Sequence, residues 1–310
     1  MRDAFIRELT KAAERDPRII LITGDLGFGV LTEFAKQFPK QFLNAGVAEQ
    51  NMTAIACGLA LEGHKVFTYS IANFTTLRCL EQLRNDVCYH QADVTAVAVG
   101  GGFSYGQLGM SHFATEDIAI LRALPEMKVF TPTGIWEAEE ATKAIIADGG
   151  PAYLRLDKGK AASDAVQGEM FQTGKARMLR NGRDVCFIAS GAILSEAIAA
   201  ADVLAQEGIS SRVLSLHTVK PLDTRAVAAA ARECGGIVAV EEHTVLGGVG
   251  GAVAEACLEA GALPGFFLRI GLPDVFPSIV GDQDYLRKEF SLDGASIAAR
   301  TRESLRRISS

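Results

Sequence analysis

Short apolar runs rich in β-branched residues alternate with helical segments along the whole chain, and this alternation limits the fold more than any other feature. Strand-like runs occur at 18–25, 65–70 and 93–100, and the second half has further runs at 184–191 and 236–241. Segments with apolar residues at helical spacing lie between them. Strands that alternate with helices form parallel sheets with helices on both faces. The sequence therefore predicts an α/β fold with mostly parallel sheets.

The length of the chain predicts two domains, because 310 residues are too many for one ordinary core. We place the first domain at 1–160, an interdomain linker at 161–182 and the second domain at 183–310. A net charge of −6 gives no electrostatic footprint for nucleic acid. The apolar runs are far too short for a membrane span.

The six cysteines lie far apart in the sequence and form no Cys-x-x-Cys pair. Most of them fall within apolar helical or strand patterns, so we expect buried free thiols in a reducing cytoplasm. The N-terminus is a charged amphipathic segment rather than a signal peptide, which also favours a cytoplasmic location. No His, Cys or Asp cluster has the spacing of metal ligands.

The segment 42–63 places an acid at the start of a helix. Its apolar residues recur at helical spacing from Met52 onward, and Glu49 and Gln50 follow the turn at Gly46. A carboxyl held there among apolar neighbours favours its protonated form and can share a proton. A solvated acid that complements the helix dipole is the other interpretation. The residues of this segment alone leave both open.

Further candidate site residues follow the predicted strands, where ligands of open α/β sheets gather. Asp25 ends the first run, although it can equally be a turn or cap residue. Phe74 and Arg78 are four residues apart, so we expect them on one face of a helix. His112 lies in a loop whose glycines, among them Gly101, Gly102, Gly106 and Gly109, let it fold closely over a ligand.

These motifs resemble the transketolase family of thiamine diphosphate enzymes. The segment around Glu49 is similar to the Gly-Val/Ile-x-Glu-Gln/His/Phe element of the family's pyrimidine-binding domain. Residues 74–85 and 106–112 resemble a Phe-x-x-x-Arg-x-x-Glu-Gln-x-Arg-Asn pattern and a Gly-x-x-Gly-x-Thr/Ser-His element. The resemblance covers almost the whole chain. It corresponds to the C-terminal part of a full-length transketolase, which split, two-subunit forms encode separately.

The resemblance implies a role for each candidate. Glu49 would share a proton with the pyrimidine ring nitrogen of thiamine diphosphate, and His112 would handle hydroxyl protons in the substrate channel. Lys158 would meet a substrate phosphate. The cofactor side would include the acid after the first strand, the aromatic residues that pack on the aminopyrimidine and the arginine of the 74–85 pattern, namely Asp25, Tyr69, Phe74 and Arg78.

The chain departs from the family at two positions on the substrate side. Sugar-converting members carry an Asp four residues before the histidine and tend to carry a phosphate-contacting His twelve residues before it. Leu108 and Gly100 stand at these positions. The usual sugar-phosphate substrate is therefore in doubt, while the cofactor side remains intact.

The chain also lacks the Gly-Asp-Gly element, followed some thirty residues later by Asn, with which transketolases hold the diphosphate and its metal. We therefore expect a partner subunit that carries the diphosphate-binding domain and the Mg²⁺ or Ca²⁺ ion. The active site would lie at the interface of an α2β2 assembly.

The second domain contains a glycine-rich run at 247–251 that opens a helix. Its spacing is not Gly-x-Gly-x-x-Gly, and no acid ends a strand about twenty residues later, so we do not interpret it as a dinucleotide site. Similar segments of split transketolases serve packing and subunit contacts. Arg155, His217 and His243 are expected to be structural.

The resemblance implies transfer of a two-carbon ketol unit from a ketose to an aldehyde acceptor by the assembled enzyme. Three alternatives stay open at this point. The first is the β subunit of a 2-oxo acid dehydrogenase, which has the same architecture but a lipoyl acceptor. The second is a 1-deoxyxylulose-phosphate synthase-like enzyme, which uses pyruvate. A non-catalytic scaffold subunit that kept the fold is the third.

Overall fold

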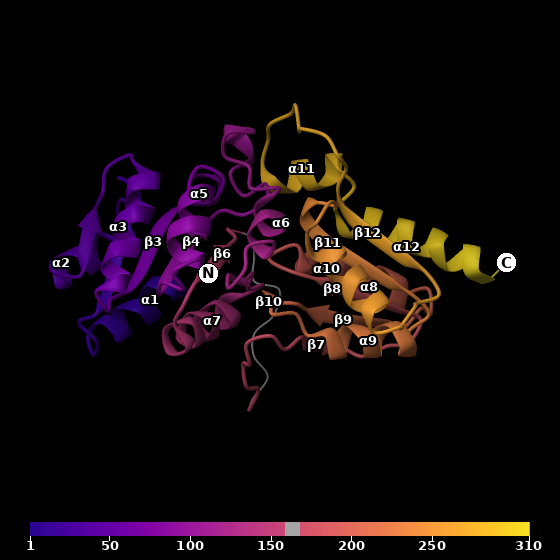
Figure 1. Ribbon diagram of the computed structural model, residues 1–310. Helices are drawn as coiled ribbons and strands as arrows, with labels where there is room; N and C mark the ends of the chain where they lie inside the picture. Colours follow the sequence, from indigo (N-terminus) through magenta and orange to yellow (C-terminus); the bar gives the residue numbers. More distant parts are fainter. Residues whose placement is uncertain (159–167, 310) are drawn as a thin grey trace.

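The computed structural model describes residues 1–158 and 168–309. They form two α/β halves that lie side by side, each with its own sheet (Figure 1). The predicted linker 161–182 therefore lies partly outside the described residues. A seven-stranded sheet occupies the N-terminal half, and a five-stranded sheet occupies the C-terminal half. The predicted α/β fold with mostly parallel sheets is confirmed.

The first sheet has the strand order β10-β5-β6-β4-β3-β1-β2. All neighbours in it are parallel except β10 and β5. Its strands are β1 (Ile19–Thr23), β2 (Phe42–Asn44), β3 (Lys65–Ile71), β4 (Val94–Val99), β5 (Lys128–Phe130), β6 (Ala152–Leu156) and β10 (Thr218–Lys220).

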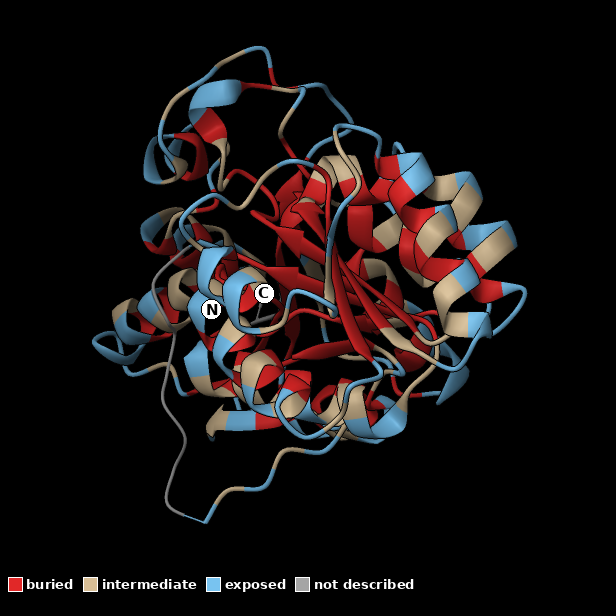
Figure 2. Cartoon of the chain, turned by 90° about the vertical axis from the view of Figure 1, so that its left-hand side faces the viewer, coloured by how far each residue is buried: buried red, intermediate tan, exposed pale blue. Residues whose placement is uncertain are grey.

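Helices cover both faces of this sheet. One face packs on α1 (Arg2–Ala13), α2 (Thr32–Gln37) and α7 (Ile135–Asp148) around a core that includes Phe5, Phe34 and Ile145. The other face packs on α3 (Glu49–Leu61), α4 (Ala72–Thr76), α5 (Leu80–Gln82), a π-helix (Leu83–Cys88) and α6 (Asp117–Arg122). The buried strands appear as an unbroken interior between exposed helix faces in Figure 2.

The second sheet has the order β12-β11-β8-β9-β7, and only β7 is antiparallel to its neighbour. Its strands are β7 (Arg177–Arg180), β8 (Val185–Ala189), β9 (Ser211–Ser215), β11 (Ile237–Thr244) and β12 (Phe267–Leu272). One face packs on α8 (Leu194–Ala205) and α12 (Gly294–Ser309), and the other on α9 (Thr224–Glu233) and α10 (Val249–Glu259). A short helix, α11 (Gln283–Glu289), follows the long loop after β12.

The two halves share structure. Strand β10 comes from the C-terminal half but pairs with β5 at the edge of the first sheet. One continuous apolar core joins α3 and α6 of the first half to α9 and α10 of the second. The halves are therefore held together by backbone hydrogen bonds between β10 and β5 as well as by side-chain packing.

Two local features bear on the predictions. The expected helix over 74–85 is not continuous, because α4 ends at Thr76 and a turn at 77–79 precedes α5 and the π-helix. All six cysteines are free and buried, as predicted. Within the described part of the chain, no helix is both long and apolar enough to cross a membrane.

Candidate functional site

The carboxyl ends of the parallel strands bring most of the candidate residues to one edge of the first sheet. Asp25 follows β1, Glu49 follows β2, Phe74 follows β3, His112 lies in the loop after β4, and Lys158 follows β6. Because parallel strands all end at the same edge, five distant stretches of sequence converge there.

Glu49 lies at the start of α3 with its side chain only 3% exposed. Gly24 packs against it, since a Cβ on that glycine would lie 3.4 Å from Glu49 Cγ. The carboxylate accepts a hydrogen bond from Arg78, with 2.7 Å between Nη1 and Oε2, while Arg78 itself is 45% exposed. The acid is thus buried in a rigid position, and its charged partner lies at the surface.

Aromatic rings connect Arg78 to His112. The Arg78 guanidinium lies 4.4 Å from the centroid of Phe74, and Phe74 meets the His112 ring edge-on at 5.1 Å. His112 Nδ1 shares a hydrogen bond of 2.9 Å with Ser111 Oγ. Phe74 and Arg78 therefore lie side by side as predicted, although the helix between them is broken.

The line of side chains continues from His112 to Lys158. The rings of His112 and Tyr105 lie 6.1 Å apart, and the Lys158 ammonium lies 3.4 Å from the centroid of Tyr105. Partial burial, followed by the charge of Arg2, lowers the pKa of Lys158. The site thus runs from a buried carboxyl at one end to a cation at the other. The sequence analysis missed Tyr105, and its only signal was an aromatic residue within a glycine-rich loop.

Asp25 is exposed and adopts a left-handed backbone conformation with φ of 56°. Asn44 holds it in place, because its Nδ2 donates to Asp25 Oδ1 at 2.9 Å and its Oδ1 accepts from the Asp25 N–H at 3.0 Å. Non-glycine residues in this conformation cluster at functional sites. Asn44 also accepts from the N–H of Gly46, so it orders the turn that leads to Glu49.

Tyr69 is the one candidate that the structure places elsewhere. Its ring is buried and stacks on Phe5 of α1, with 6.5 Å between the centroids. Burial raises the pKa of its hydroxyl. Phe67 and Tyr69 alternate with Val66 and Thr68 on β3, so both rings point to the face that α1 covers. Tyr69 is a buried core residue whose ring packs against α1.

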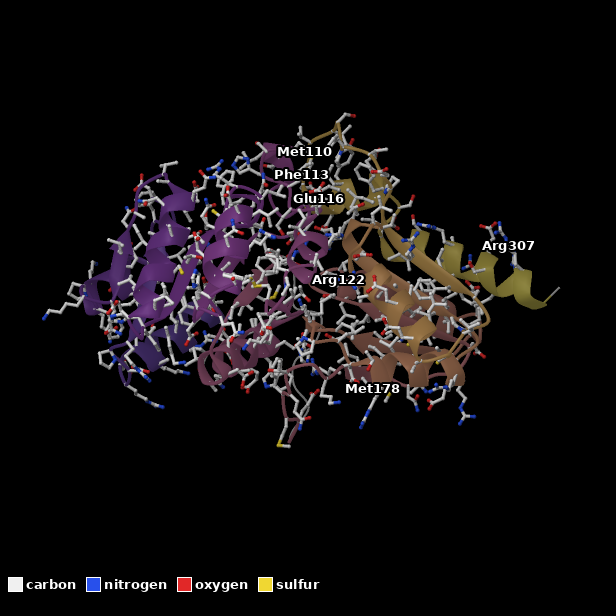
Figure 3. All side chains as sticks on the ribbon, in the orientation of Figure 1. Met110, Phe113, Glu116, Arg122, Met178 and Arg307 are labelled. Atoms are coloured by element: carbon white, nitrogen blue, oxygen red, sulfur yellow. The ribbon has the colours of Figure 1, made fainter. Side chains whose placement is uncertain are left out.

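The second half of the chain holds the loop after β4 in position. Glu242 on β11 accepts from the N–H of Phe103 at 2.6 Å and from Gln283 Nε2 at 2.7 Å, and it is paired with Arg287. Phe103 and Phe113 both insert into the core around α8 and α12. In Figure 3 Phe113 lies high on the molecule, beside the segment that precedes α11.

A buried ion cluster lies beneath this loop. Arg155 donates to Asp117 at 2.9 Å and to the carbonyls of Ala114 and Glu242 at 3.1 Å. Tyr153 also donates to Asp117, at 2.5 Å. Arg155 is therefore structural, as expected. Nearby, Arg122 donates to the carbonyl of Gly247 at 2.9 Å, and Figure 3 shows it between the two halves.

The glycine-rich run at 247–251 has no room for a diphosphate. Glu241 accepts from the N–H groups of Val249 and Gly250 at 2.7 and 3.0 Å, so a carboxylate already occupies the start of α10. A Cβ on Gly248 would lie 2.0 Å from Glu241 Oε2. His243 is buried beside it, and its Nε2 accepts from the N–H of Ala119. The glycines serve close packing.

Residues of this edge fit one end of a thiamine-type cofactor. A buried carboxyl and an aromatic face, Glu49 and Phe74, are the groups that an aminopyrimidine ring needs. Among residues 1–158 and 168–309, no three His, Cys, Asp or Glu side chains are arranged to hold a metal ion. Glu49 and Phe74 thus fit the pyrimidine ring of such a cofactor.

Comparison with known families agrees with this geometry. The transketolase pyrimidine-binding domain matches residues 1–163, and the transketolase C-terminal domain matches residues 174–297. The chain belongs to the transketolase family. The family resemblance inferred from the motifs is thereby confirmed.

Relatives of similar length include a transketolase C-terminal section and transketolase subunits. A putative transketolase C-terminal section of Methanocaldococcus jannaschii is 37% identical, over 99% of this chain and 96% of its own length. The 6-deoxy-6-sulfo-D-fructose transketolase subunit SqwH of Clostridium sp. strain MSTE9 is 36% identical, over 98% and 94%. One of the subunits of the apulose-4-phosphate transketolase of Phocaeicola vulgatus is 37% identical, over 88% and 87%.

Solved structures agree in fold. A protein described as a split gene transketolase, inactive beta4 tetramer, superimposes with a TM-score of 0.87 and 32% identity, covering 98% of this chain and 97% of the other. The transketolase of Pichia stipitis (R525L variant) superimposes with a TM-score of 0.81 at 22% identity. This chain covers only 45% of its length.

Proposed function

We propose that this chain is the C-terminal subunit of a split, thiamine diphosphate-dependent transketolase. Family membership supports the assignment, and a putative transketolase C-terminal section and a transketolase subunit are among the relatives that the chain matches over nearly their whole length. The observation that carries it is the buried Glu49 carboxyl at the strand-end edge, one side chain away from the Phe74 ring.

Each residue of the site has a proposed part in the reaction. When bound, thiamine diphosphate supplies the electron sink for breaking and making the C–C bond. Glu49 would hold a proton at the ring nitrogen of the pyrimidine, and Phe74 would orient the ring by contact with its face. His112 would exchange protons with substrate hydroxyls, and Lys158 would bind an anionic group of the substrate.

Arg78 would exchange partners when the cofactor binds. It is half exposed and rests on Phe74, so it can leave the Glu49 carboxylate without opening the core. Asp25 lies at the same edge and would border the cofactor through the Asn44-ordered turn. We propose no cofactor contact for Tyr69, because it is buried against α1.

A partner subunit would hold the diphosphate and its divalent metal ion. Large apolar side chains lie exposed at the edge that carries Glu49, with Phe28 81% and Val47 74% exposed. Exposed apolar residues beside a polar site are typical of interaction surfaces. An N-terminal, diphosphate-binding transketolase subunit is the partner that completes such a site, and an α2β2 assembly is the stoichiometry we propose.

A ketose that carries an anionic group is the substrate class we propose. Two relatives act, by their names, on sugars with a sulfo group or a phosphate. Lys158 offers the matching charge at the end of the site opposite Glu49. We also propose that the chain is divided into two domains, at residues 1–160 and 183–310.

Reconstitution tests this function. The chain is mixed with the N-terminal transketolase subunit of the same organism, thiamine diphosphate and Mg²⁺, and ketol transfer from a ketose to an aldehyde is measured. We expect transfer only when both subunits are present. If the partner alone transferred the ketol unit as fast as the mixture, this chain would have no catalytic role, and the proposal would be contradicted.

A second candidate function rests on one comparison. The 1-deoxy-D-xylulose-5-phosphate synthase of Thermomicrobium roseum is 36% identical over 97% of this chain, although this chain covers only 48% of its length. The same reconstituted pair distinguishes the two, because release of CO2 from pyruvate would favour the synthase reaction. We expect ketol transfer without pyruvate consumption.

A further inference from the structure

The first turn of α4 meets the loop that carries His112. Asn73 is the second residue of this helix, and its Nδ2 donates a hydrogen bond to the carbonyl oxygen of Ser111 at 2.7 Å. The next residue, Phe74, meets the His112 ring edge-on, with 5.1 Å between the ring centroids. Two consecutive residues of one helical turn thus contact the backbone and the ring of the same loop segment.

The Asn73 hydrogen bond ties this loop to the first half of the chain. Asn73 and Ser111 are 38 positions apart in the sequence. The loop is also anchored in the second half, where Phe103 and Phe113 are buried. Those anchors hold the loop to the second sheet, whereas Asn73 holds it to the helix that carries Phe74.

The Ser111 hydroxyl engages one nitrogen of the His112 ring. Its Oγ shares a hydrogen bond of 2.9 Å with Nδ1, which leaves Nε2 as the nitrogen that can meet a ligand. Ser111 is exposed and His112 is half-buried, so solvent alone would leave the serine free to move. Because Asn73 holds the Ser111 carbonyl, both the hydroxyl and the ring start from a fixed backbone.

Proton exchange depends on such a fixed geometry. Donor and acceptor atoms have to come within about 2.6–3.2 Å of each other. A misplacement of about 1 Å costs up to about 100-fold in rate. Asn73 and Phe74 belong to the same turn, so His112 is held at a set distance from the ring that the proposed cofactor would contact.

We propose that Asn73 is a positioning residue, which ties His112 to the helical turn of Phe74 and so sets the distance between the cofactor ring and the imidazole of the substrate channel. The Ser111 hydroxyl then orients the imidazole so that Nε2 faces the substrate. This inference rests on the proposed ketol transfer for its meaning in the reaction. The position of His112 relative to Phe74 belongs to the isolated chain and is measured without the partner.

Histidine NMR of the isolated full-length chain is the direct test. The chain has only five histidines, so ring-labelled histidine gives a simple spectrum in which His112→Ala identifies the His112 signal. The ring current of Phe74 shifts that signal, and Phe74→Leu gives its value without the ring. We expect Asn73→Leu to move the His112 signal toward this value, while His64 and His90 keep theirs.

Two variants of Asn73 assign the effect to its hydrogen bond. Asn73→Leu keeps the approximate size of the side chain and Asn73→Ala does not, but both lack the donor. We expect the same change of the His112 signal in both, and circular dichroism with thermal melting establishes that each variant is folded. A native His112 signal in the folded variants would overturn the proposal.

The reconstituted pair tests whether the position matters for the reaction. Asn73→Leu should lower kcat about tenfold, because it displaces a proton-exchanging group. Asn181→Ala, which changes an exposed asparagine of the second half, is the control and should retain the native kcat. In a His112→Ala background, Asn73→Leu should lower kcat no further, since no imidazole is left to position.

The possible results separate this inference from the proposed function. If the pair with the native chain transfers no ketol unit, the proposed function fails, and the NMR measurement still decides whether Asn73 holds His112. In an active pair, a native kcat in Asn73→Leu would overturn the positioning role. A full tenfold loss in the His112→Ala background would also overturn it, because the loss would then not act through His112.

Discussion

At the scale of single residues, the site depends on a carboxyl that packing keeps from water. Glu49 is 2% exposed, and the small residues around Gly24 and Gly46 bring the backbone close to it. Its one charged contact is with Arg78, whose side chain is 45% exposed. We propose that this position serves proton exchange with the cofactor.

We predict that Glu49→Gln lowers ketol transfer by the reconstituted pair about 100-fold or more, the range of a lost proton-transfer group. The isolated variant should melt within a few degrees of the native chain, because the shape of the side chain is kept. Glu62→Gln, at the exposed C-terminal end of the same helix, is the matched control and should retain native turnover. A fully active Glu49→Gln pair would remove Glu49 from the mechanism.

Buried His217 predicts a pH dependence of stability. Its ring stacks on Phe171 at 4.1 Å, and burial lowers the pKa of the imidazole in spite of nearby Glu137. The unfolded chain, with a His pKa of about 6.5, then binds the proton more tightly than the folded chain. The free energy of unfolding should therefore fall as the pH drops through about 6.5, by about 1.4 kcal/mol per unit of pKa depression.

Urea unfolding between pH 8 and pH 5 measures this effect. His217→Gln should flatten the slope of stability against pH in the same range, while His90→Gln, at an exposed position, should leave it unchanged. A native-like slope in His217→Gln would assign the pH dependence to other groups.

Sequence reasoning succeeded for residues whose place is set by the ends of strands. Asp25, Glu49 and Lys158 follow strands, so the parallel sheet alone brings them to one edge. Tyr69 lies in the core, and the alternation of Phe67 and Tyr69 along β3 already indicates a shared buried face. The Arg78–Glu49 pair joins residues 29 positions apart, and only the folded chain specifies such a contact.

At the scale of elements, the loop after β4 depends on a strand from the other half. Glu242 of β11 accepts a hydrogen bond from the N–H of Phe103, and Phe103 and Phe113 are buried in the core of the second half, with residues of α8 and α12. The rings of Tyr105 and His112 lie between these two anchors. The second half thus sets the position of the loop that carries Tyr105 and His112.

We predict that Glu242→Ala lowers the free energy of unfolding by about 3–5 kcal/mol, because it leaves Arg287 buried without its main partner. The variant should also raise the KM for the ketose, since the N–H of Phe103 loses its acceptor. Glu196→Gln is the control, because Glu196 also contacts Arg287, at 3.6 Å, but does not touch the loop.

Chemical denaturation and steady-state kinetics of the reconstituted pair measure both effects. Glu196→Gln should change stability without changing KM. If Glu242→Ala leaves the KM at the native value, the contact stabilises the fold and has no positioning role.

Elements also differ in how far the sequence predicts them. The long strands and helices follow from periodicity, whereas β10 has only three residues and pairs antiparallel with β5 across the domain boundary. No local pattern predicts such a pairing. The sequence did not predict the break at 77–79, because Phe74 and Arg78 are four residues apart, as on one face of a helix.

At the scale of the whole molecule, large exposed apolar residues lie both inside and outside the proposed interface with the partner subunit. Phe28 and Val47 lie at the strand-end edge beside Glu49, whereas Leu263 is equally exposed in the loop that leads into β12, at the opposite ends of the strands. The proposed partner covers only the first group. This difference gives a test of the interface that does not depend on catalysis.

We predict that Val47→Asp and Phe28→Asp each weaken assembly with the partner subunit about tenfold or more, as loss of a buried apolar anchor does. Leu263→Asp, with a native exposure of 71%, should leave the affinity unchanged. Sedimentation velocity of the mixed subunits measures the dissociation constants. Equal weakening by all three variants would contradict an interface at the Glu49 edge.

The most direct measurement is thiamine diphosphate-dependent ketol transfer by the mixed subunits, with native chain and with Glu49→Gln. The account predicts that neither subunit is active alone, that the native mixture is active, and that the Glu49→Gln mixture assembles but transfers no ketol unit. Activity of the partner without this chain, or native activity with Glu49→Gln, would contradict it.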